Sequence, residues 1–124
     1  MSRFIKCDVD GESRTVYQYL SGSQPCEAYR IHEEFGIGEY LCYEYEYGED
    51  DYAQLCYNYI PTRQGAEGDM LILTREDIER LNSCLETLEA DGSTEARYIW
   101  MIKAIRDFML KYPHQARFIF NSEF

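Results

Sequence analysis

Two tyrosine-rich segments in the first half of the chain alternate between two kinds of side chain, and this alternation limits the folds available to it. In Glu39–Tyr47 the odd positions from 41 onward are Leu and Tyr, whereas the even positions are Tyr, Cys and Glu. In Tyr52–Ile60 the odd positions are Ala, Leu and Tyr, and the even positions from 52 to 58 are Tyr, Gln, Cys and Asn. A repeat of two residues is that of a β-strand, whose side chains point alternately to opposite faces. The acidic Gly48–Asp51 segment predicts a turn, and Pro61 ends the second strand because proline has no N–H to donate. The sequence therefore predicts an antiparallel hairpin with one face towards the core and the other towards water.

Further strands are predicted on both sides of this hairpin. Arg3–Val9 and Arg14–Leu20 are joined by Asp10-Gly11, a dipeptide typical of two-residue hairpin turns. Met70–Leu73 and Ala116–Phe120 are short apolar segments of strand length.

Residues 23–35 allow two interpretations. One is a short helix that Ser23 caps, with Ile31 on its buried face; the other is an extended path through Tyr29 and Ile31. In either case Gly36 ends the element.

Residues 74–112 predict two helices. Thr74 is the expected cap of the first, which ends near Gly92, a residue free to adopt a positive φ. Ser93 or Thr94 then begins the second, which Pro113 stops. The expected buried stripes are Ile78, Leu81, Leu85 and Leu88 in the first helix and Tyr98, Ile102, Ile105, Met109 and Tyr112 in the second.

These patterns predict an α+β fold in one domain, residues 1–124. Residues 1–73 are mainly strands, 74–112 are two helices and 116–120 form a terminal strand. We expect an antiparallel sheet of about four to six strands, with the C-terminal αα-hairpin packed on one face.

The composition limits the environment and the partners. The formal net charge is −11, which disfavours direct binding to nucleic acid or to an anionic membrane. The five cysteines are odd in number and none is in a C-x-x-C pair, and no apolar segment approaches the length of a membrane span. We therefore expect free thiols in the cytoplasm, and no oligomeric state follows from the sequence.

The sequence predicts no catalytic residues, no metal site and no cofactor. His32 is followed by two glutamates but lacks the second histidine of a zinc-binding helix, and no phosphate-binding glycine loop is present. Cys42 or Cys56 could pair with His32 as thiol and imidazole, but cysteines in strands are usually inert.

The positive signal is an acidic, aromatic surface on the predicted hairpin. Residues 1–69 hold 14 acids and 5 bases, and eight of these acids lie between residues 33 and 51 with no Lys or Arg among them. Seven of the twelve tyrosines lie between residues 40 and 59. Carboxylates beside tyrosines complement a surface rich in Arg and Lys. The predicted partner-binding residues are Glu33, Glu34, Tyr40, Glu44, Glu46, Glu49, Asp50, Asp51 and Tyr52.

Basic grooves of this kind usually hold nucleic acid, so the predicted surface is a candidate mimic of it. Carboxylates on alternate strand residues lie about 6.7 Å apart. Duplex DNA carries one charge per ~1.7 Å of axis. We therefore expect the surface to fill one basic pocket and not to copy a whole duplex.

In its small size, its acidity and its single domain, the chain resembles proteins encoded by phages and mobile elements, including anti-CRISPR and anti-restriction proteins. Leu73–Leu81 is similar to the helix start of such phage-type proteins, and Phe118–Phe124 to their ending. The resemblance covers about the last 50 residues and carries over no site residue. It implies a non-enzymatic viral inhibitor that binds a basic surface of a host defence nuclease or nucleoprotein effector in the host cytoplasm.

Two alternatives remain at this point. The chain is a structural or oligomer-forming module, or it is a small thiol-dependent enzyme or ligand binder that uses Cys42, Cys56 or His32. The sequence does not decide which face of the hairpin is exposed.

Overall fold

A computed structural model of the chain describes residues 2–20, 28–47, 57–62 and 68–123. The described part contains six strands and three helices. The strands are β1 (Ser2–Val9), β2 (Glu12–Leu20), β3 (Glu39–Tyr47), β4 (Tyr57–Pro61), β5 (Gly68–Thr74) and β6 (Arg117–Glu123). The helices are α1 (Ala28–Phe35), α2 (Asp77–Asp91) and α3 (Ala96–Lys111).

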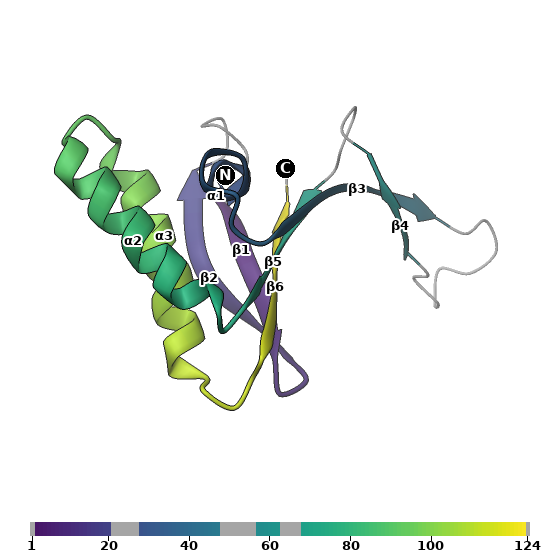
Figure 1. The fold of residues 1–124 in the computed structure, drawn as a ribbon. Coiled ribbons are helices and arrows are strands. Elements are labelled where there is room, and N and C mark those ends of the chain that lie inside the picture. Colours follow the sequence, from purple (N-terminus) through teal and green to yellow (C-terminus); the bar gives the residue numbers. More distant parts are fainter. Residues whose placement is uncertain (1, 21–27, 48–56, 63–67, 124) are drawn as a thin grey trace.

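The six strands form one antiparallel sheet in the order β2-β1-β6-β5-β3-β4. Helices α2 and α3 pack side by side on one face, which confirms the predicted α+β class and the C-terminal αα-hairpin (Figure 1). The first and last strands, β1 and β6, are neighbours in the sheet.

The turn between β1 and β2 has the predicted two-residue form. Asp10 has a φ of 54° and Gly11 a φ of 79°. Positive φ at both central residues is the signature of a type I′ turn, whose twist matches that of the two strands. Glycine adopts such a φ without strain, and aspartate tolerates it better than most residues.

The helical interpretation of residues 23–35 is confirmed from Ala28 onward. Ala28 and Ile31 are buried on the inner face of α1, and the helix gives way to Gly36, whose φ is 65°. Ser23, the expected cap, lies outside the described residues.

The αα-hairpin is confirmed, but both helices begin later than predicted. Thr74 still pairs with Arg117 in the sheet, so α2 begins at Asp77, whose carboxylate accepts a hydrogen bond from the Thr74 N–H at 2.9 Å. Helix α3 begins at Ala96 instead of Ser93 or Thr94.

The core lies between the sheet and the helices. Leu81, Leu85 and Leu88 of α2 are buried as predicted, and so is Cys84, which the predicted stripe omitted. Helix α3 buries Tyr98, Ile102, Ile105 and Met109, again as predicted. Leu71, Leu73, Phe118 and Phe120 of the two central strands β5 and β6 complete the core.

The structure shows which face of β3 meets the core in the first half of the strand, a point that the alternation leaves open. Leu41 is 40% exposed, whereas Tyr40 on the even face packs against the core cluster. Tyr40 is in register with Leu71, and Leu71 is fully buried. The even face therefore meets the core here, because residues in register share one face of a sheet.

Within the described residues, no helix has the length and apolar character needed to cross a bilayer.

The core predicts different costs for the same substitution at two leucines. Leu81 is fully buried, so Leu81→Ala leaves a cavity and lowers the free energy of unfolding by about 3 kcal/mol. Leu110 is 51% exposed, so the matched Leu110→Ala costs less than about 1 kcal/mol. Urea unfolding of the two variants measures the difference, and equal losses would show that the core has been assigned wrongly.

Candidate functional site

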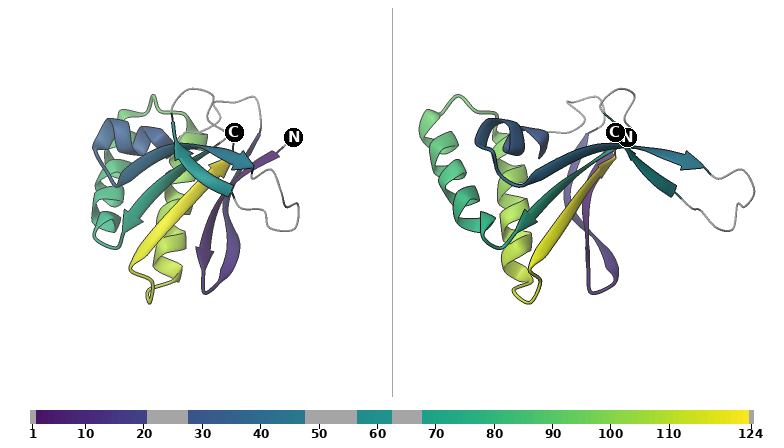
Figure 2. Two further views of the ribbon diagram at one scale, coloured as in Figure 1. Left: turned by 90° about the vertical axis from the view of Figure 1, so that its right-hand side faces the viewer. Right: turned by 45° about the vertical axis from the view of Figure 1, so that its right-hand side comes forward.

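Strand β3 belongs to two different ladders. Residues 39–43 pair with β5, and residues 43–47 pair with β4. Only Tyr43 has a partner on both sides, Gly68 in β5 and Pro61 in β4. Beyond Tyr43, β3 and β4 continue as a two-stranded ribbon, which we call the arm and define as residues 44–47 and 57–61. Figure 1 and Figure 2 show the arm projecting from the sheet, clear of the helices.

The register of the arm sorts its residues onto two faces. Tyr45 is opposite Tyr59 and Tyr47 is opposite Tyr57, so these four positions of the backbone belong to one face. Glu44 and Glu46 are on the other face, opposite Ile60 and Asn58. The backbone register thus places the tyrosine positions on one face of the arm and the two glutamate positions on the other.

The root of the arm is a tyrosine that lies over a glycine. Tyr43 is only 1% exposed, and its hydroxyl donates to the Ser122 carbonyl at 3.5 Å. A Cβ added at Gly68 would lie 2.5 Å from that carbonyl oxygen and 2.6 Å from Cζ of Tyr43. Glycine is thus the one residue that lets the tyrosine ring and the β6 backbone approach β5 together.

A second tyrosine, Tyr40, holds β3 to β5 on the face of the sheet that meets the core. The Tyr40 hydroxyl donates to Oδ2 of Asp69 at 2.5 Å, and Asp69 is fully buried. The Cys42 thiol in turn donates to the Tyr40 hydroxyl at 3.5 Å. Hydrogen bonds to a charged acceptor are stronger than neutral ones, and a buried carboxylate requires such donors. Tyr40 was predicted to flank the acidic surface; it lies in the body of the sheet and anchors β3 there.

The predicted acidic residues are divided between two elements. Glu33 and Glu34 are exposed on α1, and Glu34 accepts a hydrogen bond from Nε of Arg30 at 3.0 Å, so the chain already supplies its counter-charge. Glu44 lies on the arm, half-buried, and it makes no ion pair with any other described residue. Glu46 is also on the arm. Glu49, Asp50, Asp51 and Tyr52 lie outside the described residues.

The described thiols are not arranged as nucleophiles. Burial raises the pKa of both the Cys7 and the Cys84 thiols to about 11, which keeps them protonated at neutral pH. Cys42 has its hydrogen bond to Tyr40, and Nδ1 of His32 lies 3.0 Å from the Gly38 carbonyl. The thiol–imidazole pair considered from the sequence is thus not formed by Cys42, and Cys56 lies outside the described residues. Across the described chain, no three His, Cys, Asp or Glu side chains converge as metal ligands.

Asp69, Gly68 and Tyr43 were not singled out by the sequence analysis. A polar Gly-Asp pair directly before the apolar Met70–Leu73 segment was the available signal. A glycine inside a strand often marks a close approach of another backbone.

Comparison of the chain with protein-family models, with curated proteins and with solved structures gives no match.

The root of the arm predicts a specific coupling. Gly68→Ala forces the Tyr43 ring and the Ser122 carbonyl apart, and it lowers the free energy of unfolding by about 1–3 kcal/mol. In a Tyr43→Ala background the ring is absent, so the same Gly68→Ala change costs less than it does in the wild type. Urea unfolding of the two single variants and the double variant measures this coupling. If the double variant loses the sum of the two single losses, a Cβ at residue 68 does not interfere with the Tyr43 ring and the prediction is wrong.

Proposed function

We propose that the arm is the binding element of a non-enzymatic inhibitor, which occupies the basic nucleic-acid-binding surface of a host defence nuclease. The observation that supports this most is the arm itself, a two-stranded ribbon that leaves the body at Tyr43 and sorts its carboxylates and tyrosines onto separate faces. A ribbon with this shape enters a groove that a flat sheet surface does not reach.

The distribution of charge also supports a cationic partner. Most described arginines have an acidic partner within the chain, but residues 33–51 contain eight acids and no base. Like charges in neighbouring positions of a sheet destabilise it. A basic partner relieves this repulsion and is also steered towards the arm at low ionic strength.

The arm's geometry favours a plug for one pocket over a copy of duplex DNA. Glu44 and Glu46 are two residues apart in one strand, which corresponds to about 6.7 Å. The phosphates of duplex DNA are several times more closely spaced along the axis. The tyrosine face offers rings on which partner arginines stack, so the acidic face supplies charge while the aromatic face supplies contact area.

A structural or oligomer-forming module is the second candidate function. Trp100 and Leu110 of α3 are 60% and 51% exposed, and exposed large apolar side chains are typical of protein contacts. Self-association through α3 depends little on salt, whereas binding through the arm weakens as salt rises.

Charge reversal on the hairpin tests the proposal. The variant Glu44→Lys, Glu46→Lys, Asp50→Lys removes the carboxylates that pair with the partner's cations. We expect it to lose the host nuclease that the wild-type protein retains in a pull-down at low salt, with affinity lower by about 100-fold. The melting temperature changes by only a few degrees, about the effect expected of surface substitutions.

The matched control reverses three exposed acids on α2, with Glu79→Lys, Glu86→Lys and Asp91→Lys. It changes the net charge equally and leaves the arm intact, so it retains the partner. The affinity of the retained protein for DNA or RNA is then measured, and we expect the wild-type chain to lower this affinity. Unchanged capture by the arm variant rejects the site, and salt-independent self-association without capture supports the second candidate.

A further inference from the structure

Arg117 differs from the other arginines whose side chains the structure describes. Arg14, Arg30, Arg80, Arg97 and Arg106 each contact a carboxylate, and Arg75 donates to backbone carbonyls at the end of α3. The exposed guanidinium of Arg117 has no hydrogen bond or ion pair within the described chain. In a protein with 23 acids and 12 bases, an arginine that has found no acid is available for an external anion.

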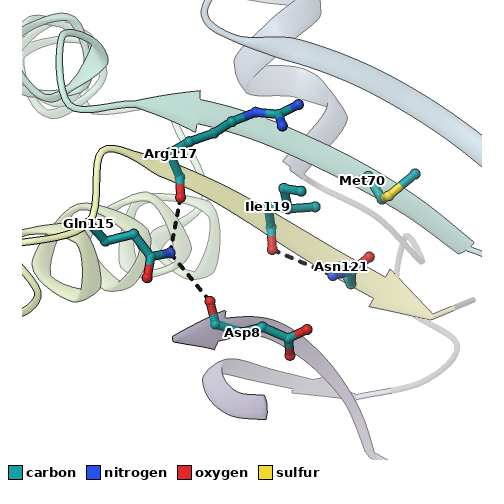
Figure 3. A pocket seen from close by; sticks show the side chains of 6 residues that line it. All are labelled: Asp8, Met70, Gln115, Arg117, Ile119 and Asn121. Carbon is teal, nitrogen blue, oxygen red and sulfur yellow. Dashed lines mark hydrogen bonds between the residues drawn. The ribbon is translucent and has the colours of Figure 1, made fainter. Parts of the chain in front are cut away.

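Arg117 borders a hollow on the face of the sheet that the helices leave uncovered. The hollow has a volume of about 290 Å³, near the lower limit for small-ligand pockets. Its lining residues are Asp8, Met70, Gln115, Arg117, Ile119 and Asn121. Figure 3 shows Arg117 extending from β6 towards β5, while Asp8 is carried by β1 on the other side of β6.

The hollow therefore has an apolar floor between two opposite charges. Ile119 and Met70 form the floor, and Asp8 is exposed and makes no ion pair in the described part of the chain. One end is held in shape by Gln115, whose side-chain amide donates to the Asp8 carbonyl at 3.3 Å and to the Arg117 carbonyl at 3.0 Å. These two hydrogen bonds tie β1 to β6 beside the charged pair.

The spacing of the strands limits the size of the ligand. Asp8 and Arg117 lie on neighbouring strands, and the register puts Arg117 two residues beyond the residue opposite Asp8, so their Cα atoms are about 8 Å apart. An extended peptide spans at most about 3.6 Å per residue, so three residues bridge this distance and a single amino acid does not.

We propose that this hollow binds a short peptide with free ends and an apolar middle residue. The peptide's carboxylate binds Arg117, its ammonium group binds Asp8, and its apolar side chain lies over Ile119 and Met70. Arg117 is suited to the carboxylate because its planar guanidinium forms two parallel hydrogen bonds with one. None of the residues that line the hollow belongs to the arm, so this site does not depend on the inhibitor proposal.

The test is a titration of the full chain with the tripeptide Ala-Leu-Ala, followed by amide chemical shifts in NMR. We expect saturable shifts at Asp8, Arg117 and Ile119. The peptide amide Ala-Leu-Ala-NH2 lacks the carboxylate and binds about tenfold more weakly. N-acetyl-Ala-Leu-Ala lacks the ammonium group and is weakened in the same way.

Two variants assign the ends of the peptide. Arg117→Gln lowers the affinity for Ala-Leu-Ala about tenfold and binds the tripeptide and its amide equally well. Asp8→Asn binds the tripeptide and its N-acetyl form equally well. Arg97→Gln removes an arginine of the helix surface and leaves binding unchanged. The proposal is overturned if Ala-Leu-Ala gives no saturable shifts, or if Arg117→Gln binds both peptides as the wild type does.

Discussion

The change of partner along β3 is the constraint on which the rest of the structure depends. The strand is paired with β5 up to Tyr43 and with β4 from Tyr43 onward. At this residue the sheet body ends and the arm begins, because β5 starts at Gly68, opposite Tyr43. The absence of a Cβ at Gly68 lets the Tyr43 ring lie over the ladder and be almost completely buried. Gly68 therefore sets the position at which β3 leaves the body of the sheet.

Local patterns were enough to predict most of the elements. The alternation in residues 39–47, the Asp10-Gly11 turn and the leucine stripe of α2 each depend on neighbours in sequence, and all three are found in the structure. The pairing of β1 with β6 joins the two ends of the chain, and no local pattern indicates it. The start of α2 was misplaced because Thr74 suits both a helix cap and the sheet, and pairing with Arg117 keeps it in the sheet.

The candidate site could be predicted only in part, for the same physical reason. Tyrosine is stable both in a core and at a surface, so the alternation alone does not show which face of β3 meets the helices. Tyr40 lies on the core side because its hydroxyl binds the buried Asp69, and that contact spans 29 residues of sequence. Glu34 was grouped with the arm by its charge, although Arg30, one helical turn before it, already neutralises it. The positions of Tyr45, Tyr47, Tyr57 and Tyr59 share one face of the arm because the register pairs odd positions with odd positions, and the alternation alone does not fix that register.

Hydrogen exchange along β3 tests most directly whether the strand leaves the body at Tyr43. We expect hydrogen-bonded amides in residues 39–43 to exchange slowly, like those of the central strands, because they open only with the core. Hydrogen-bonded amides in residues 44–47 exchange faster, because a two-stranded ribbon opens without unfolding the sheet. A sharp change in rate at Tyr43 is the predicted result. One uniform slow rate from residue 39 to residue 47 would contradict it, since the arm would then be part of the body.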